Sequence, residues 1–312
     1  MDILLLFVSI VGLWAGTELV VRGALRIADY FQLSQLFVGI AILAIGTDLP
    51  ELVVSISASL ESVNEGVNTS GIILGNAIGS SFSQISVVLG VIGLMSYITL
   101  TRRHLVFDGI MLIGSVILLG LVGIDGKITR VEGMILILTY IVYYYRLLHR
   151  EKEKKHRKDP ASKKLWWSIT MLLIGLGVTV YASELVVSNA LAITEELGIR
   201  QSFVGIVLIG IGTSLPELAV SLNAIRKKAQ GLSVGNLIGS NIFDALIPVG
   251  VGASISELTF ERKLIWFDLS FLLGLSILVL VFFYRKKGIQ LTEAMILIFV
   301  FILYGVVKML GQ

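Results

Sequence analysis

Apolar stretches about as long as a bilayer is thick recur along the whole chain, and they restrict its fold more than any other feature. A helix needs roughly 20 apolar residues to cross the hydrocarbon core of a membrane. Of the 312 residues, 55% are hydrophobic and only 15% are charged, whereas a soluble domain carries about 25% charged residues. We therefore predict an all-α, polytopic membrane protein with almost no soluble part. The ten predicted transmembrane helices cover residues 3–21, 37–60, 72–98, 105–124, 134–148, 165–187, 203–225, 234–255, 264–284 and 295–309.

Basic side chains gather in every second loop between these helices. Arg22 and Arg26 follow the first predicted helix, and the longest loop, residues 149–164, carries a run of lysine and arginine. The alternate loops carry glutamate instead, among them Glu61 and Glu195. Because loops rich in lysine and arginine stay in the cytoplasm, we predict a multi-pass protein of the plasma membrane with both termini outside.

The two halves of the chain repeat one another. Gly-Thr-Asp-Leu-Pro-Glu at 46–51 returns as Gly-Thr-Ser-Leu-Pro-Glu at 212–217, and Gly-Asn-x-Ile-Gly-Ser occurs at 75–80 and again at 235–240. Each half holds five predicted helices, and five is odd, so the second repeat must enter the membrane from the opposite side. This inverted arrangement is typical of many secondary transporters. The predicted units are the first repeat at residues 1–148, the basic cytoplasmic linker at 149–164 and the second repeat at 165–312.

Four acidic residues, Asp48, Glu51, Glu217 and Asp244, lie well inside predicted helices. A charge at bilayer depth costs about 2.5–3.5 kcal/mol on insertion scales and is a functional candidate by default. No lysine or arginine lies at a similar depth to neutralise these side chains. Carboxylates that repel one another need protons or bound cations to coexist. The sequence therefore predicts a cation site in the middle of the membrane.

Prolines stand directly before two of these glutamates, at Pro50 and Pro216. A proline has no N–H and clashes with the preceding helical turn, so each should free the carbonyl oxygen of the glycine four residues earlier. We predict a broken helix in each half, with loose carbonyls beside a carboxylate. Sites built from oxygen atoms alone suit hard cations such as Ca²⁺, which takes 6–8 oxygen ligands.

Polar faces of the third and eighth predicted helices complete the candidate pocket. Ser80 and Gln84 are four residues apart, as are Ser240 and Asp244, and residues with this spacing share one face of a helix. The Gly-x-x-x-Gly pairs that precede them predict close packing between helices.

Other acidic residues have plainer interpretations. Arg22 follows Glu18 at a spacing of four, so we predict a salt bridge between them. Glu184 is the repeat mate of Glu18, that is, the equivalent residue in the second half. It has a serine at that spacing, and its role stays open. Asp108 and Asp268 lie near the starts of predicted helices, where we expect them to cap or anchor the helix.

The chain resembles the cation/Ca²⁺ antiporter superfamily, and most closely the prokaryotic Na⁺/Ca²⁺ exchangers. The resemblance covers nearly the whole chain and rests on the two Gly-Thr-x-Leu-Pro-Glu motifs, each followed by Gly-Asn-x-Ile-Gly-Ser. It implies that Glu51 and Glu217 coordinate Ca²⁺ and also Na⁺, that three Na⁺ exchange for each Ca²⁺, and that the first and sixth helices slide across the others. The further ligands that it implies are the backbone carbonyls of Thr47 and Thr213 for Ca²⁺, the carbonyls of Ala44 and Gly210 for outer Na⁺ sites, the hydroxyls of Ser80, Ser214 and Ser240 for Na⁺, and Asp244 in the central site.

Two positions depart from the family pattern. Asp48 stands where serine is usual, and Gln84 stands where asparagine or aspartate is usual. Asp48 adds a potential negative charge to a crowded site, so either it stays protonated or the site accommodates more positive charge. A titrating Asp48 fits H⁺ coupling, and additional positive charge fits K⁺ co-transport or an altered stoichiometry.

The sequence favours a secondary active antiporter that exchanges Na⁺ for Ca²⁺ by alternating access at a shared central carboxylate site. Ca²⁺/H⁺ exchange or K⁺-dependent Na⁺/Ca²⁺ exchange through the same site is the alternative. A cation channel could share the repeat symmetry, but it would conduct single-channel currents far above the turnover of an exchanger. An intramembrane protease that uses Asp48 and Asp244 leaves the duplicated motif and the paired glutamates unexplained. With no phosphate-binding loop in the chain, we expect no enzyme and no cofactor. The expected partners are membrane lipid and the transported Na⁺ and Ca²⁺, with H⁺ or K⁺ as alternatives; we expect no nucleic acid, and no oligomer is required.

Overall fold

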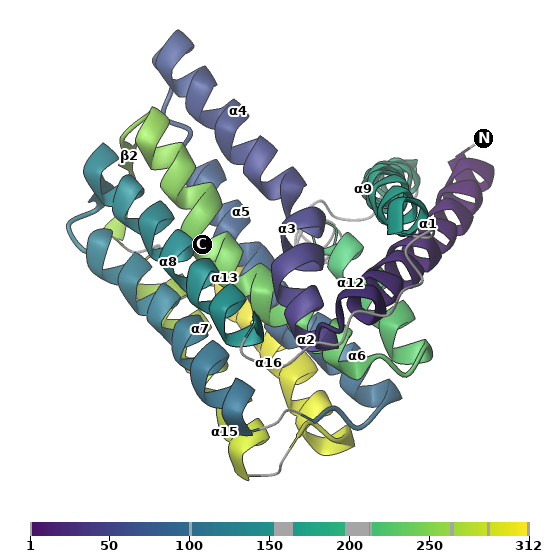
Figure 1. The fold of residues 1–312 in the computed structure, drawn as a ribbon. Coiled ribbons are helices and arrows are strands. Elements are labelled where there is room, and N and C mark those ends of the chain that lie inside the picture. The colour runs from purple at the N-terminus through teal and green to yellow at the C-terminus, as the bar shows by residue number, and fades with distance from the viewer. Residues whose placement is uncertain are drawn as a thin grey trace.

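The computed structural model describes residues 2–99, 102–152, 165–196, 212, 214–262, 265–285 and 288–310, and this part of the chain is almost entirely helical (Figure 1). Its α-helices are α1 (Asp2–Phe31), α2 (Gln35–Val38), α3 (Ala44–Thr47), α4 (Leu49–Glu65), α5 (Ser70–Ser83), α6 (Leu89–Met95), α7 (Arg102–Val122), α8 (Arg130–Lys152), α9 (Leu165–Glu196), α12 (Leu215–Arg226), α13 (Gln230–Ile255), α15 (Ser270–Arg285) and α16 (Leu291–Leu310). The π-helical segments are η1 (Gly39–Leu43), η2 (Gln84–Val88) and η5 (Ile265–Leu269).

The apolar helices follow the predicted transmembrane pattern. Within the described ranges, seven helices are long and apolar enough to cross a membrane, and the pair Gln35–Thr47 and Leu49–Glu65 adds a span that is bent by 41°. Val106–Val122 in α7 is a shorter apolar stretch at the position of the fourth predicted helix. Most of the first part of the seventh predicted helix lies outside the described residues, and α12 forms its remainder. The structure is therefore consistent with ten helices.

The predicted end of the first helix is wrong. α1 continues ten residues past the predicted boundary at residue 21, to Phe31, so Arg22 and Arg26 lie on a helix and not in a loop. The extension has a local cause, since no glycine pair or proline interrupts this segment before Gln32, whose φ of 54° leaves the helical region. Apolar length marks where a helix enters and leaves the bilayer, whereas backbone chemistry decides where the helix ends.

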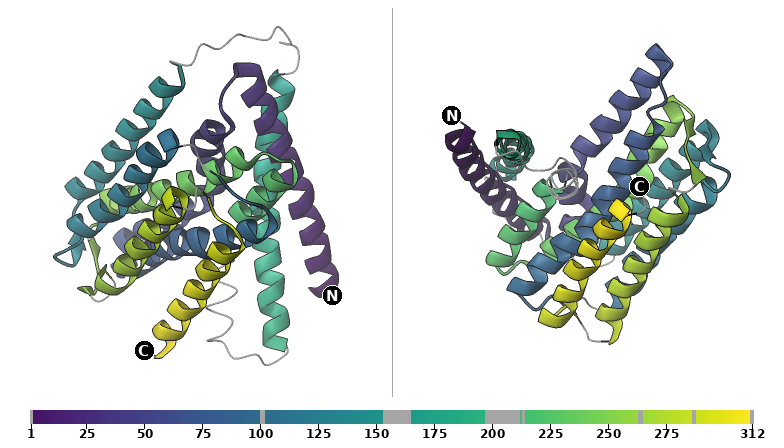
Figure 2. Two further views of the ribbon diagram at one scale, coloured as in Figure 1. Left: turned by 90° about the horizontal axis from the view of Figure 1, so that it is seen from below. Right: turned by 180° about the vertical axis from the view of Figure 1, so that it is seen from behind.

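Repeat mates α1 and α9 lie side by side along one edge of the molecule (Figure 2). Ideal Cβ atoms show how closely they approach: one added at Gly12 would lie 3.6 Å from Cβ of Ala182, and one at Gly16 would lie 2.8 Å from the backbone N of Thr179. Farther along, a Cβ at Gly23 would lie 2.8 Å from the carbonyl oxygen of Ser168. Along these three contacts the residue numbers of α1 rise while those of α9 fall, so the two helices run antiparallel. An inverted repeat requires this arrangement.

Two short antiparallel pairings, which the all-α prediction did not include, also join the halves. β1 (Lys127–Ile128) pairs with β2 (Leu258–Thr259), so that Ile128 lies opposite Leu258, and Ile98 bridges to Ile289. Leu258 is the repeat equivalent of Ile98, 160 residues later, and Ile289 is the repeat equivalent of Ile128, 161 residues later. Each pairing is therefore the symmetry copy of the other.

Asp108 and Asp268 anchor equivalent helix pairs in the two halves, as expected. The Tyr143 hydroxyl of α8 donates to Oδ1 of Asp108 at 3.3 Å, and the Tyr304 hydroxyl of α16 donates to Oδ1 of Asp268 at 2.7 Å. In the second half, Lys308 Nζ also lies 3.0 Å from Oδ2 of Asp268.

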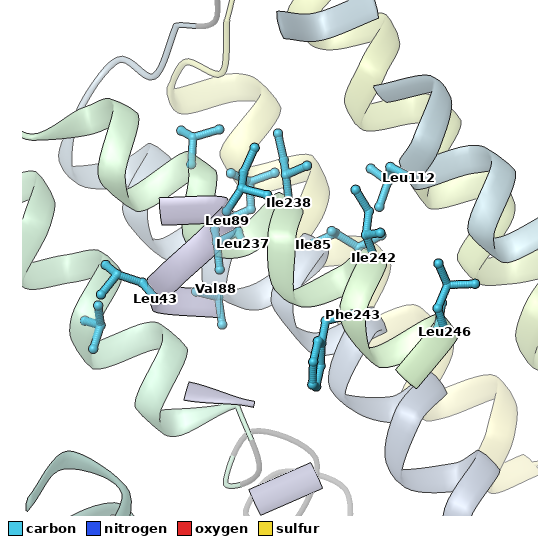
Figure 3. Packing of buried hydrophobic residues seen from close by; sticks show 14 of the residues in the cluster. Leu43, Ile85, Val88, Leu89, Leu112, Leu237, Ile238, Ile242, Phe243 and Leu246 are labelled. Atoms are coloured by element: carbon cyan, nitrogen blue, oxygen red, sulfur yellow. The ribbon is translucent and has the colours of Figure 1, made fainter. Parts of the chain in front are cut away.

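The centre of the molecule is formed by α13 and by the continuous segment from α5 through η2 to α6, where most residues are buried. A methyl group at Gly239 of α13 would lie 2.8 Å from Cα of Ile40 in η1, so the predicted close packing of this glycine is confirmed. Figure 3 shows the apolar residues of this centre in one cluster, among them Leu43, Ile85, Val88, Leu89, Leu237, Ile238, Ile242 and Phe243.

Candidate cation site

The second transmembrane segment is broken at the predicted position. α3 ends at Thr47 and α4 begins at Leu49, and Asp48 between them has φ −89° and ψ 6°, outside the helical region. Pro50 follows in the first turn of α4, where its missing N–H leaves the carbonyl oxygen of Gly46 without its helical donor. The break therefore exposes main-chain oxygen atoms directly beside the acidic residues.

A helix starts at the equivalent position of the second half. Ser214, the repeat mate of Asp48, has φ −94° and ψ 12°, and α12 begins at the next residue with Pro216 in its first turn. Both breaks place a glutamate, Glu51 or Glu217, in the first turn of the following helix. Thr213 and Gly210, which the sequence also assigned to the site, lie outside the described residues.

Asp48, Glu51, Glu217 and Asp244 come together in the interior. Each is at most 2% exposed, and the four carboxyl groups are close enough to interact electrostatically with one another. Among the described residues, none donates a hydrogen bond to either carboxylate oxygen of Asp48, Glu51 or Glu217, or to Oδ1 of Asp244. No described lysine or arginine forms an ion pair with any of these four side chains.

Four buried carboxylates without positively charged partners are unstable unless a proton or a cation joins them. Burying a charged group without a partner is costly, and four neighbouring carboxylates add mutual repulsion to that cost. Within the described ranges, no three acidic or histidine side chains converge closely enough to hold a metal ion by themselves. Carbonyl, hydroxyl and amide oxygens must therefore complete the coordination of any ion bound here.

A side-chain network fixes one wall of the site. Gln84 Nε2 donates to Ser80 Oγ at 3.0 Å and to Asp244 Oδ2 at 3.2 Å, so the predicted shared face of Ser80 and Gln84 is confirmed. Asn241 Nδ2 donates to Gln84 Oε1 at 2.8 Å, a contact that the sequence analysis missed. Its position three residues before Asp244 on the same helix was the available signal, because residues at this spacing share a face.

A second set of contacts holds the hydroxyl groups that lie near Asp48 and Ser214. Ser214 Oγ donates to the carbonyl oxygen of Ser80 at 3.3 Å, and Thr47 Oγ1 donates to the carbonyl oxygen of Leu43 at 3.2 Å. Asn236, which was not among the predicted site residues, lies between the halves, with its Oδ1 3.5 Å from Thr47 Oγ1 and its Nδ2 3.4 Å from Ser221 Oγ. These hydroxyls are thus held by main-chain and amide groups, whereas Oδ2 of Asp244 is the one oxygen of the four carboxyl groups that has a described donor.

The structure buries the described members of the predicted ligand set. They come from both halves of the chain and from different helices: Ala44, Thr47, Asp48, Glu51, Ser80, Gln84, Ser214, Glu217, Ser240 and Asp244. Ser240 is fully buried, and its hydroxyl has no hydrogen-bond partner in the described part of the chain. Its oxygen is therefore available to an ion.

A cavity of about 310 Å³ leads to this site. Glu51 and Pro50 of α4 and Pro216 of α12 line it next to the broken helices, and Val180, Glu184 and Ser188 of α9 line it farther along. Glu51 is almost completely buried whereas Glu184 is exposed. The cavity therefore runs from the buried Glu51 to the surface.

Three features together identify this chain as a secondary transporter. Repeat mates that run antiparallel, matched helix breaks and buried carboxylates between them are the features of secondary transporters with inverted repeats.

The chain belongs to the sodium/calcium exchanger protein family, whose model matches residues 1–148 and 167–310. An uncharacterized membrane protein of Methanocaldococcus jannaschii is 34% identical over 251 residues, which are 80% of each chain. The sodium/calcium exchanger MaX1 of Methanosarcina acetivorans is 25% identical over 98% of both chains.

Solved structures have the same fold. The sodium-calcium exchanger NCX_Mj, in a crystal soaked without Na⁺ and Ca²⁺, superposes with a TM-score of 0.82 at 29% identity, covering 97% of each chain. The exchanger fold that the family resemblance implied is therefore confirmed.

Proposed function

We propose that this protein is an electrogenic antiporter that exchanges Na⁺ for Ca²⁺ by alternating access. The observation that carries the proposal is the cluster of four buried carboxyl groups without described basic partners between two matched helix breaks. MaX1 and NCX_Mj, both named as sodium/calcium exchangers, support the identity of the two ions.

Glu51 and Glu217 are the proposed shared ligands of Ca²⁺ and Na⁺. Each begins a helix directly after a break, so its carboxylate lies beside main-chain oxygens that a cation can use at the same time. The hydroxyls of Ser80, Ser214 and Ser240 suit Na⁺, which needs oxygen ligands but less negative charge. Because an empty site keeps unpaired charges buried, reorientation is favoured when ions occupy it, and this couples the two ion flows.

The proposed orientation follows from the basic loops. The linker at residues 149–164 lies in the cytoplasm, both termini lie outside, and the membrane is the plasma membrane. In this orientation α4 and α9 run outward, so the cavity that contains Glu184 opens to the outside. Residues 1–148 and 165–312 are the two repeat units, α1 and α9 slide across the other helices, and Na⁺ and Ca²⁺ are cargo. The protein carries out no enzymatic step in this proposal.

Uptake of ⁴⁵Ca²⁺ into proteoliposomes tests the function. Vesicles loaded with Na⁺ should take up Ca²⁺, whereas vesicles loaded with K⁺ or with an acid interior should not. Glu51→Gln and Glu217→Gln should each reduce uptake by about 10- to 100-fold, because each removes a charged ligand from a buried site. Glu61→Gln, which neutralises an exposed acid at the end of α4, is the control.

The alternative coupling ions give different results in the same assay. Uptake driven by an acid interior without Na⁺ would refute Na⁺ exchange and identify H⁺ as the coupling ion. Uptake that requires K⁺ together with Na⁺ would indicate K⁺ co-transport. Asp48→Asn separates these cases, because exchange that keeps its Na⁺ coupling and its pH dependence in this variant does not use Asp48 as a proton carrier.

A further inference from the structure

The repeat places an acidic residue at equivalent positions on α1 and α9, but the two residues differ in their ion-pair partners. Glu18 of α1 forms ion pairs with Arg22 on the same helix and with Lys227, the residue after α12, at 2.7 Å from its Nζ. The predicted salt bridge with Arg22 is confirmed. Two cations therefore neutralise Glu18 and join α1 to α12.

Glu184 has neither of these partners. In the repeat, Ser188 is equivalent to Arg22, and Glu61 is equivalent to Lys227. Within the part of the chain that the structure describes, no lysine or arginine forms an ion pair with Glu184. Its side chain is exposed and lines the 310 Å³ cavity.

The other end of this cavity is also acidic. Glu51 lines the cavity with only 2% of its surface exposed, and neither of its carboxylate oxygens has a hydrogen-bond partner in the described residues. Asn76 adds an amide group to the wall, and Pro50 and Val54 are among the residues that leave the rest largely apolar. Glu184 therefore lies at the exposed part of a largely apolar cavity, and Glu51 lies at its buried part, with its two unsatisfied carboxylate oxygens covered by neighbouring atoms.

We infer that Glu184 is an entry subsite that captures a hydrated cation from the outside and passes it to Glu51. The inference rests on the proposed function, because Glu51 must be an ion ligand. Coulomb attraction grows with the charge of the ion, so the subsite favours Ca²⁺ over Na⁺ at equal concentration. Glu184 holds the ion through water at an exposed position, which gives weak binding and rapid transfer.

The chain contains no cysteine, which allows a test by charge at this one position. Glu184→Cys is purified, reconstituted and treated from outside with a membrane-impermeant thiol reagent that adds either a sulfonate or a trimethylammonium group. The external Ca²⁺ concentration for half-maximal Na⁺-driven uptake is then measured for each form. Glu184→Gln and untreated Glu184→Cys should raise this KM about three- to tenfold, with little change in maximal rate.

The sign of the added charge is the decisive observation. The sulfonate should bring KM back toward that of the unchanged protein, and the ammonium should raise it further. Both effects should shrink at high ionic strength, because salt screens charges that are exposed to solvent. Glu61→Cys, modified with the same two reagents, is the matched control for an acid on the same side but outside the cavity lining, and its KM should not depend on the reagent.

Two results would overturn the inference. One is an unchanged KM in Glu184→Gln. The other is a KM that the two reagents move in the same direction, because that indicates obstruction and not charge. The reagents act on one folded preparation, so misfolding cannot imitate a charge-dependent shift. If the unchanged protein shows no Na⁺-driven Ca²⁺ uptake, the proposed function itself fails, which is a distinct outcome.

Discussion

The antiparallel contact between α1 and α9 predicts opposite effects for two alanine substitutions on one helix. A Cβ atom at Gly16 would lie 2.8 Å from the backbone N of Thr179, which cannot move without displacing α9. A Cβ atom at Gly12 would lie 3.6 Å from Cβ of Ala182, an ordinary van der Waals contact. Both glycines lie in the interior of α1, so Gly→Ala gains a similar helix propensity of about 0.8–1 kcal/mol at each.

The difference between the two variants isolates the packing term. Overpacking of a tight contact costs about 1–3 kcal/mol, so Gly12→Ala should be neutral or stabilising, and Gly16→Ala should be less stable than Gly12→Ala by about 1–3 kcal/mol. The measurement is the thermal unfolding midpoint in detergent at one fixed scan rate. At about 2–4 °C per kcal/mol, the two midpoints should differ by several degrees.

Exchange rate provides a second measurement on the same variants. α1 and α9 are the helices expected to slide across the other helices, so a change in their spacing should slow ⁴⁵Ca²⁺ uptake in Gly16→Ala more than in Gly12→Ala. Equal midpoints, or a higher midpoint for Gly16→Ala, would refute the conclusion that backbone approach at Gly16 sets the spacing of this pair.

Three further predictions follow from contacts outside the α1–α9 pair. Gln84→Leu keeps the side-chain size but removes three hydrogen bonds, one of them to a carboxylate. It should therefore lower the unfolding free energy by about 2–4 kcal/mol. The measurement is thermal unfolding, with Gln84→Glu as the comparison. Lys227→Met removes one of the two cations at Glu18, and because the pair is partly exposed the loss should be at most about 1 kcal/mol and should vanish at high salt; a larger, salt-independent loss would contradict this. Tyr304→Phe should lower the unfolding free energy by about 1 kcal/mol more than the equivalent Tyr143→Phe. The hydroxyl of Tyr304 lies 2.7 Å from its aspartate, compared with 3.3 Å for Tyr143, and it also accepts a hydrogen bond from Lys308 at 3.1 Å. Equal unfolding midpoints for the two variants would contradict this prediction.

Much of the candidate site could be predicted because its signals are local in sequence. Pro50 and Pro216 interrupt a helix through their own chemistry, and Glu51 and Glu217 stand next to them in both copies of the motif. The spacing of four between Ser80 and Gln84 fixes a shared face on any α-helix. Asn241 was missed because nothing along the chain shows that the amide of Gln84, on a distant helix, reaches it.

The amino-acid sequence was sufficient to predict the apolar spans, the inverted repeat, the two helix breaks and the presence of buried acidic residues, because each depends on composition or on the chemistry of neighbouring residues. The folded structure was needed to see which carboxylates meet, how far α1 extends beyond its predicted apolar span, and that short strands join the halves. It also decided that Glu18 is neutralised while its repeat mate Glu184 lines a cavity. The repeat makes these two positions equivalent in sequence, but the residues that surround them come from other helices, and their charges become neighbours only when the chain has folded.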